Sequence, residues 1–128
     1  MSEPQDAVEL LAREAASLVA RLRPWTPARW TAQLDGWTRA EVVHHLAQSF
    51  ADAAGEAPVP LPVLDSPLAL PDQLAVTADD LVRLRPPEQT ALRAVAHLLA
   101  HRRDLLGEDV PAALGARLGG TPIACPDA

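Results

Sequence analysis

The chain has 128 residues, enough for one domain with a hydrophobic core and too short for two ordinary domains. Hydrophobic residues make up 48% of it, but aromatic residues make up only 3% and tyrosine is absent, so the core must consist mainly of Leu, Val and Ala. Such a composition suits closely packed helices. The 17 acidic residues outnumber the 11 basic ones and give a formal net charge of -6, so nucleic acid, which needs clustered positive charge, is not an expected partner.

The N-terminal stretch MSEPQDAVELLAREAAS is acidic and lacks the cationic segment of a secretory signal peptide. No apolar run approaches the roughly 18 residues that a membrane-spanning helix needs. We therefore expect a cytoplasmic protein without a membrane partner. The one cysteine, Cys125, has no partner for an internal disulfide, and we expect it to be a free thiol near the end of the chain.

Four helices are predicted from the spacing of apolar residues and from the positions of proline. Their expected ranges, in chain order, are 5–22, 39–54, 72–85 and 87–106. Pro86 and Pro87 separate the last two, and Pro87 suits the first turn of a helix. A weaker helix is predicted around 112–118, before a tail that we expect to be flexible from about residue 119.

The segment PWTPARWTAQLDGWT, residues 24–38, contains all three tryptophans and predicts a compact turn or a short helix. Thr38 and Glu41 have the spacing of a capping box, in which each side chain bonds a backbone N–H of the other. Trp37 directly precedes this cap. We expect its indole to anchor the start of the second helix in the core rather than to contact a ligand.

Residues 55–71, GEAPVPLPVLDSPLALP, contain five prolines and cannot continue a helix. Short connections force neighbouring helices to be antiparallel, whereas a connection of this length allows the second and third helices to run in the same direction. The predicted fold is therefore an all-α four-helix bundle with a long crossover between helices two and three, forming a single domain over residues 1–128.

All four histidines fall on two predicted helices, His44 and His45 on the second and His97 and His101 on the fourth. The latter two are one helical turn apart on one face, so they could share a metal ion. The bulky residues of that helix lie nearly opposite, which disfavours packing of the pair in the core and leaves a solvated pair as the alternative. Leu98 stands where a zinc peptidase with H-E-x-x-H needs glutamate, which excludes that class. Periodicity does not choose between His44 and His45 as a third ligand.

Two stretches together resemble one family. LDGWTRAEVVHHLAQ is similar to the signature of the DinB/YfiT-like superfamily and of mycothiol-dependent maleylpyruvate isomerase N-terminal domains, in which a Trp-Thr or Trp-Ser cap precedes a helix with His-Leu-Ala. AHLLAHRRDL resembles the later H-x-x-x-H-R helix of that family. The resemblance implies that His45, His97 and His101 bind one divalent ion. Zinc, nickel and iron all accept neutral imidazole, so the ligands do not name the metal.

The resemblance further implies a bacterial, metal-dependent S-transferase that uses a low-molecular-weight thiol, bacillithiol or mycothiol, and a small-molecule substrate. A homodimer is also expected, through an exposed apolar stripe on the first or the fourth helix. No acid or base in the sequence clearly accompanies the three ligands, so the alternative is a non-catalytic, dimerising binding module with a structural metal or none. Arg102, matching the arginine after the last histidine, is expected to be structural, substrate-orienting or solvated.

Overall fold

The computed structural model describes residues 6–55 and 59–107. Within them, the chain forms five α-helices, one 3₁₀ turn and a small antiparallel ribbon, which confirms the all-α class. The helix predicted around 112–118, the tail from 119 and Cys125 lie outside the described residues. None of the helices in the described ranges is both long enough and apolar enough to cross a bilayer.

The long helices agree with the predicted ranges to within a few residues. In chain order the elements are α1 Ala7–Leu22, α2 Pro27–Thr31, β1 Gln33–Leu34, β2 Trp37–Thr38, α3 Arg39–Ala54, η1 Pro67–Ala69, α4 Leu70–Arg83 and α5 Glu88–Leu106. Helix α4 begins earlier than expected and includes Pro71 in its first turn. A proline is tolerated there because the backbone N–H of the first turn has no partner within the helix.

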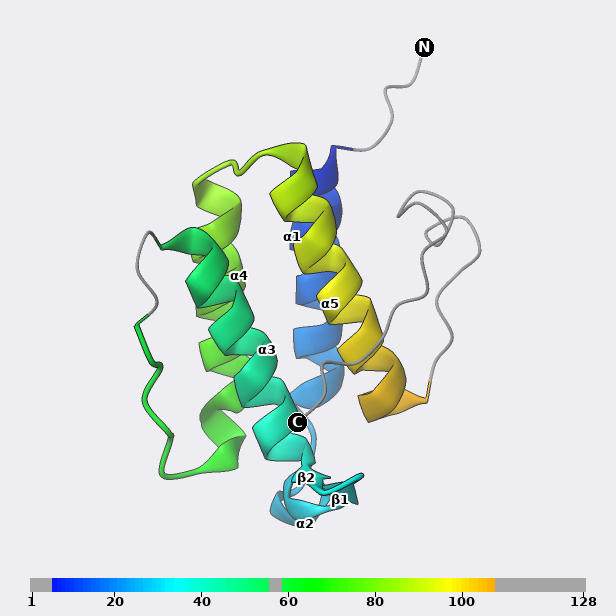
Figure 1. Cartoon of the computed structure of the whole chain (residues 1–128). Helices are drawn as coiled ribbons and strands as arrows, with labels where there is room; N and C mark the ends of the chain where they lie inside the picture. The colour runs from blue at the N-terminus through cyan, green and yellow to red at the C-terminus, as the bar shows by residue number, and fades with distance from the viewer. Residues whose placement is uncertain (1–5, 56–58, 108–128) are drawn as a thin grey trace.

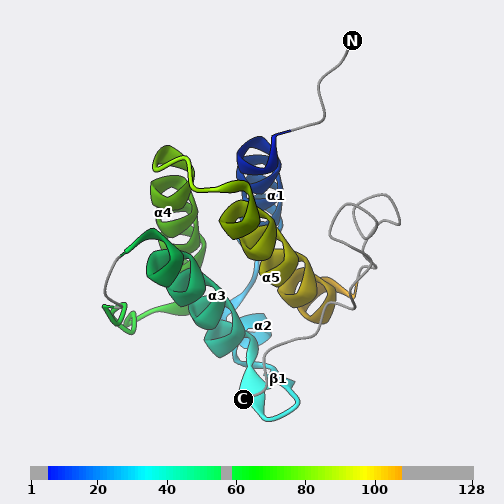
Figure 2. The ribbon, with the colours of Figure 1, turned by 45° about the horizontal axis from the view of Figure 1, so that its top comes forward.

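The long helices α1, α3, α4 and α5 lie side by side along their lengths (Figure 1). Helices α1 and α3 each contact both α4 and α5, so α1 and α3 are diagonal neighbours, as Figure 2 shows. Helices α3 and α4 run in the same direction, and α1 and α5 run in the opposite one (Figure 1). This is possible because the extended segment 59–66 returns along the outside of the molecule to the end at which α3 begins (Figure 1).

The start of α3 has the predicted capping box. The backbone N–H of Glu41 donates to Thr38 Oγ1 at 3.1 Å, and the backbone N–H of Thr38 donates to Glu41 Oε1 at 2.8 Å. Before this cap the chain forms a hairpin, in which Asp35 and Gly36 have φ values of 46° and 87°. Such values suit the Asp-Gly turn of a two-residue hairpin. The region predicted as a turn or a short helix is thus the short helix α2 followed by the β1–β2 ribbon.

Side-chain amides hold the extended segment in place. Gln48 of α3 donates from Nε2 to the carbonyl oxygen of Val59 at 3.0 Å and accepts the backbone N–H of Leu61 at 2.7 Å. Gln73 of α4 donates to the carbonyl oxygen of Pro62 at 3.2 Å. A proline-rich segment has few backbone N–H groups that can donate hydrogen bonds. These amides therefore replace the backbone pairing that a regular element would supply.

The core is built mainly from Leu, Val and Ala, as the composition predicts, and also contains two tryptophans and one phenylalanine. Trp30 is 0% exposed and Trp25 is 5% exposed, and their ring centroids are 4.8 Å apart. Trp37 is only partly buried, does not belong to the core cluster, and contacts His45 edge-on at 5.9 Å. The prediction that Trp37 is a core anchor is wrong, because the hairpin places this side chain against His45 and in the wall of a cavity rather than in the core.

Replacing Trp30 by Ala should lower the free energy of unfolding by about 3–5 kcal/mol, the usual cost of deleting a fully buried aromatic side chain. Trp37→Ala should cost about 1 kcal/mol or less, since a partly exposed side chain leaves no sealed cavity. Urea unfolding of the two variants, followed by circular dichroism, measures both costs. Equal destabilisation by the two changes would contradict the assignment of Trp30 to the core and Trp37 to the surface.

Candidate functional site

Three of the four histidines form a row between α3 and α5. The ring centroids of His45 and His101 are 5.7 Å apart and the planes are inclined by 28°, while those of His97 and His101 are 6.4 Å apart and inclined by 43°. His101 is therefore the middle member. The side chain of His44 points away from α3 in a different direction. Among the described residues, its ring has no contact with this row. The row contains the same three residues that the family resemblance implies as ligands.

His101 is only 2% exposed, so the expectation that a histidine pair on this helix avoids the core is wrong for this residue. The cause is the width of the buried face of α5, which packs against α1 on one side and α3 on the other. Ala91, Ala94 and Ala100 are all buried on this helix. The buried face therefore includes small residues and is wider than the bulky residues alone indicate. His97, one turn earlier, is partly buried, and a fully solvated pair is excluded as well.

A hydrogen bond fixes the tautomer of His101. Its Nδ1 lies 2.6 Å from the carbonyl oxygen of His97, and because a carbonyl only accepts, Nδ1 must carry the proton and donate it. In the neutral ring this leaves Nε2 with a free lone pair. Metal-binding histidines commonly have this arrangement, with one ring nitrogen held by a carbonyl and the other available to the metal.

The pKa values of both histidines on α5 are lowered. For His97 the main cause is desolvation by burial, with further contributions from the nearby His45 and Arg93. For His101 burial again dominates, and the bond to the His97 carbonyl and the charge of Asp104 oppose it in part. Lowered pKa values keep these imidazoles neutral near pH 7. Neutral imidazole is the form that binds a metal ion.

The spacing of the row approaches that of a shared metal site. Imidazoles that bind one zinc ion at about 2.0–2.1 Å have ring centres roughly 5 Å apart. The observed separations of 5.7 and 6.4 Å are slightly larger. As placed, no group of three or more His, Cys, Asp or Glu side chains in residues 6–55 and 59–107 already converges on one point. Convergence on one ion therefore requires these side chains to move closer together. Imidazole is a donor that zinc, nickel and iron all accept.

Arg102, directly after the central histidine, links α5 to α1. Its Nη1 lies 3.3 Å from Glu14 Oε1 and 3.4 Å from Ser17 Oγ. The side chains of Arg102 and Glu14 are only 19% and 15% exposed. The sequence left three roles open for this arginine: structural, substrate-orienting or solvated. The structure shows a structural contact and excludes a fully solvated side chain. The ion pair holds the helix that carries His97 and His101 against its neighbour.

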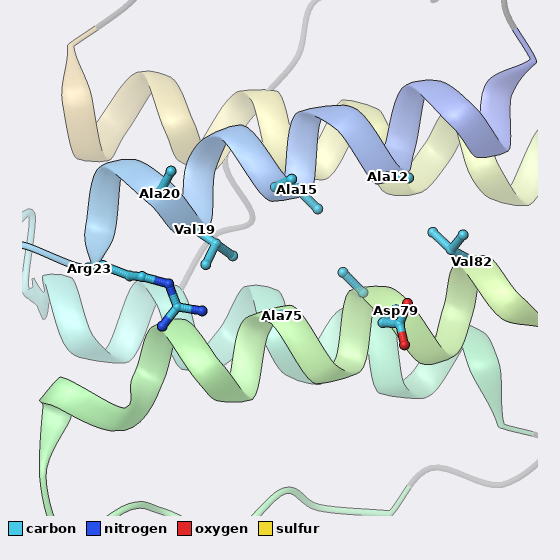
Figure 3. Close-up of a pocket in the computed structure, with 10 residues that line it drawn as sticks. Ala12, Ala15, Val19, Ala20, Arg23, Ala75, Asp79 and Val82 are labelled. Atoms are coloured by element: carbon cyan, nitrogen blue, oxygen red, sulfur yellow. The ribbon is translucent and has the colours of Figure 1, made fainter.

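A cavity of about 490 Å³ lies on the other side of His45. Trp37 of the ribbon and His44 of α3 form part of its wall, and the opposite wall comes from the segment between Val63 and Leu70. This cavity has no signal in the sequence, because a proline-rich connection lacks periodicity and its position depends on tertiary contacts. The cavity is separate from a groove between α1 and α4, lined mainly by Ala and Val (Figure 3).

Comparison of the chain with protein-family models, with curated proteins and with solved structures finds no match. The DinB-like identity of the chain therefore stays a prediction from the two sequence stretches. The geometry that bears on it is the row of three imidazoles described above.

In metal-free protein, stability should fall as the pH is lowered below about 6.5. The folded pKa values of His97 and His101 lie below the unfolded value, so in the window between them the unfolded chain binds more protons than the folded one. The free energy of unfolding should therefore rise with pH through this window and level off above it. Urea midpoints at pH 5.5, 6.5 and 7.5 with a chelator present measure the effect. His101→Gln should flatten the dependence, and equal midpoints for the unaltered protein would contradict it.

Proposed function

We propose that the protein is a DinB-like four-helix bundle, with a long crossover between α3 and α4, that binds one divalent ion through His45, His97 and His101. The observation that carries the proposal is the row of three imidazoles contributed by α3 and α5. The middle ring is buried and directs one nitrogen to a backbone carbonyl, which leaves the other for a ligand bond. A buried imidazole loses its hydration, and a bond at the second nitrogen would offset that cost.

The activity proposed for this site is transfer of a low-molecular-weight thiol, bacillithiol or mycothiol, to a small-molecule substrate. A divalent ion with an open position supplies the charge that lowers the pKa of a bound thiol. The three ligands are neutral, so they leave the charge of the ion uncompensated and favour an anionic thiolate. The burial of His101 and of the α5 face limits water at one side of the row. The cavity beside His45 offers space for a substrate on the other.

Replacing any of His45, His97 or His101 by Ala should remove most of the bound metal, because three ligands act together on one ion. His44→Ala is the matched control from the adjacent position on α3, and it should retain the metal. Elemental analysis of protein purified without a histidine tag gives the ratio of metal to protein, and thermal melts check that each variant folds. Loss of metal in His44→Ala with retention in His45→Ala would reverse the assignment between these neighbours.

A thiol should bind the ion as thiolate and release a proton. Cobalt-substituted protein mixed with mycothiol, bacillithiol or a simple analogue should then give a sulfur-to-metal charge-transfer band in the near ultraviolet. The band should be absent in His101→Ala. Cys125→Ser is the necessary background, because the thiol of Cys125 could produce the same band. An unchanged spectrum at millimolar thiol, with cobalt confirmed bound, argues against the transferase and for the binding module.

The alternative is a non-catalytic module that dimerises, and the groove between α1 and α4 favours it (Figure 3). Its volume is about 510 Å³, and Figure 3 places Ala12 of α1 opposite Val82 of α4. The large exposed apolar side chains in the described ranges lie on or directly after α4 and on the segment 59–68, not on α1 or α5, and none of them lines this groove. The groove itself is lined by α4 and the alanines of α1, so a copy of the chain bound there would meet these side chains rather than an apolar stripe on the first or fourth helix.

Sedimentation equilibrium tests this dimer. Ala16→Glu places a charge in the groove and should shift the protein to monomer, because burying an unpaired carboxylate in an apolar interface is costly. Ala53→Glu makes the same exchange at an exposed position of α3 outside the groove and should leave the dimer intact. If the unaltered chain sediments only as monomer at high micromolar concentration, the dimerising module is ruled out.

A further inference from the structure

We infer that a second cavity, between the end of α3, the extended segment and α4, binds a compact aliphatic molecule that carries one ammonium group next to Asp80. This α3–α4 cavity goes beyond the proposed metal site, because none of the four histidines lines it. It shares only Leu64 with the cavity beside His45. It shares no lining residue with the groove between α1 and α4, which lies on another face of α4.

The size and the walls of the α3–α4 cavity suit a compact aliphatic molecule. Its volume of about 570 Å³ falls within the range of small-molecule sites. Most of its aliphatic lining comes from Ala51, Ala54, Leu61, Leu64 and Val76. Val76 is 59% exposed, so the fold leaves apolar surface uncovered at this place. Removing such surface from water is favourable, and an aliphatic ligand would do so.

One end of the α3–α4 cavity is negatively charged. Helices α3 and α4 run in the same direction (Figure 1), so Asp80, close to the end of α4, lies at the end of the cavity where α3 also ends. Ala54 and Gly55, the last residue of α3 and its C-cap, line this end. The C-terminal end of a helix carries a partial negative charge, and the last turn of α3 contains no basic residue to offset it. A helix end and a carboxylate therefore both favour a cation here.

The carboxylate of Asp80 has no ion-pair partner within residues 6–55 and 59–107. Its neighbours on α4 differ, since Asp79 pairs with Arg83 at 2.8 Å and Asp72, at the opposite end of the cavity, pairs with Arg23 at 2.6 Å. None of the lining residues is Arg, Lys or His. An anionic ligand would thus lose hydration without meeting a cation. An ammonium group would instead meet a carboxylate that is still available for pairing.

The wall that the extended segment supplies is held in place before any ligand binds. Gln73, which lines the cavity, donates to the carbonyl oxygen of Pro62, and Gln48 bonds the backbone of Val59 and Leu61. Ordering a segment on binding costs affinity, and a wall already fixed avoids that cost. The contacts that hold the crossover therefore also prepare this cavity for a small ligand.

Three probes with the same aliphatic cage test the inference: adamantanemethylammonium, adamantanemethanol and adamantanecarboxylate, titrated calorimetrically at pH 7 into the full chain with a chelator present. We expect the ammonium compound to bind roughly three- to tenfold more tightly than the alcohol, the combined effect of an exposed carboxylate and a helix end. The carboxylate probe should bind most weakly. Equal binding of the ammonium compound and the alcohol, tightest binding of the carboxylate probe, or no binding of any probe at millimolar concentration overturns the inference.

A matched pair of variants assigns the charge preference to one side chain. Asp80→Asn removes the carboxylate at nearly constant size, so the ratio of the ammonium and alcohol affinities should fall by about two- to fivefold while the alcohol affinity stays unchanged. Asp35→Asn makes the same exchange at an exposed position of the hairpin outside the cavity and should leave the ratio unchanged. Both variants alter the net charge of -6 equally, so the comparison separates the local carboxylate from the charge of the whole protein.

A second pair of variants locates the aliphatic cage. Ala51→Leu places carbon atoms in the cavity and should weaken all three probes by about fourfold or more, the loss of about one buried methylene group. Ala53→Leu adds the same atoms at an exposed position of α3 outside the cavity and should change none of the affinities.

Thermal melts establish that each variant is folded before titration, and Asp80→Asn, at an exposed position, decides the matter if Ala51→Leu does not fold. A ratio that persists unchanged in folded Asp80→Asn, or probe affinities that persist unchanged in folded Ala51→Leu, overturns the inference. Because the chelator removes metal from all samples, these results do not depend on whether the histidine row binds an ion.

Discussion

Helix α3 packs against α4 and α5 through one apolar face, and this packing sets the direction of every other side chain on the helix. Val43, Leu46 and Ala47 are 0% exposed and Phe50 is 1% exposed. Turning the helix about its axis would expose them, and losing the burial of a phenylalanine side chain alone costs about 1.5–3 kcal/mol. The rotation of α3 is therefore fixed, and with it the directions of the polar residues that border this face.

Two consecutive histidines on this fixed helix have different surroundings. Successive residues of a helix are about 100° apart, so neighbours in sequence point in different directions. Both line the cavity bounded by the crossover segment, but His45 also contacts the ring of His101 on α5. Gln48 follows His44 by one helical turn and holds the wall of that cavity. The histidine row and the cavity thus both depend on how α3 packs against its neighbours.

The helices could be predicted because local chemistry marks their ends. Thr38 and Glu41 cap α3, and Pro86 and Pro87 separate the last two helices, so these boundaries need no tertiary information. The burial of His101 could not be predicted in the same way, since it depends on α5 having neighbours on two sides. The surface position of Trp37 likewise follows from the path of the hairpin.

Some features of the candidate site could likewise be predicted from local spacing, and others depend on tertiary contacts. Which histidines share a helix face is a property of spacing, and the one-turn separation of His97 and His101 was available from the sequence. The choice of His45 over His44 came from the family resemblance alone, and the structure brings His45, not His44, next to His101. The cavity could not be found from spacing, because one of its walls belongs to a connection without regular structure.

The ion pair of Arg102 and Glu14 restricts how homologous chains can vary. Both side chains are more than four-fifths covered, so replacing either one alone would remove an opposite charge from beside a largely buried one. Such a change is strongly destabilising, whereas exchanging both for apolar residues of similar size is often neutral. Positions 14 and 102, which are 88 residues apart in the chain, should therefore change together in evolution.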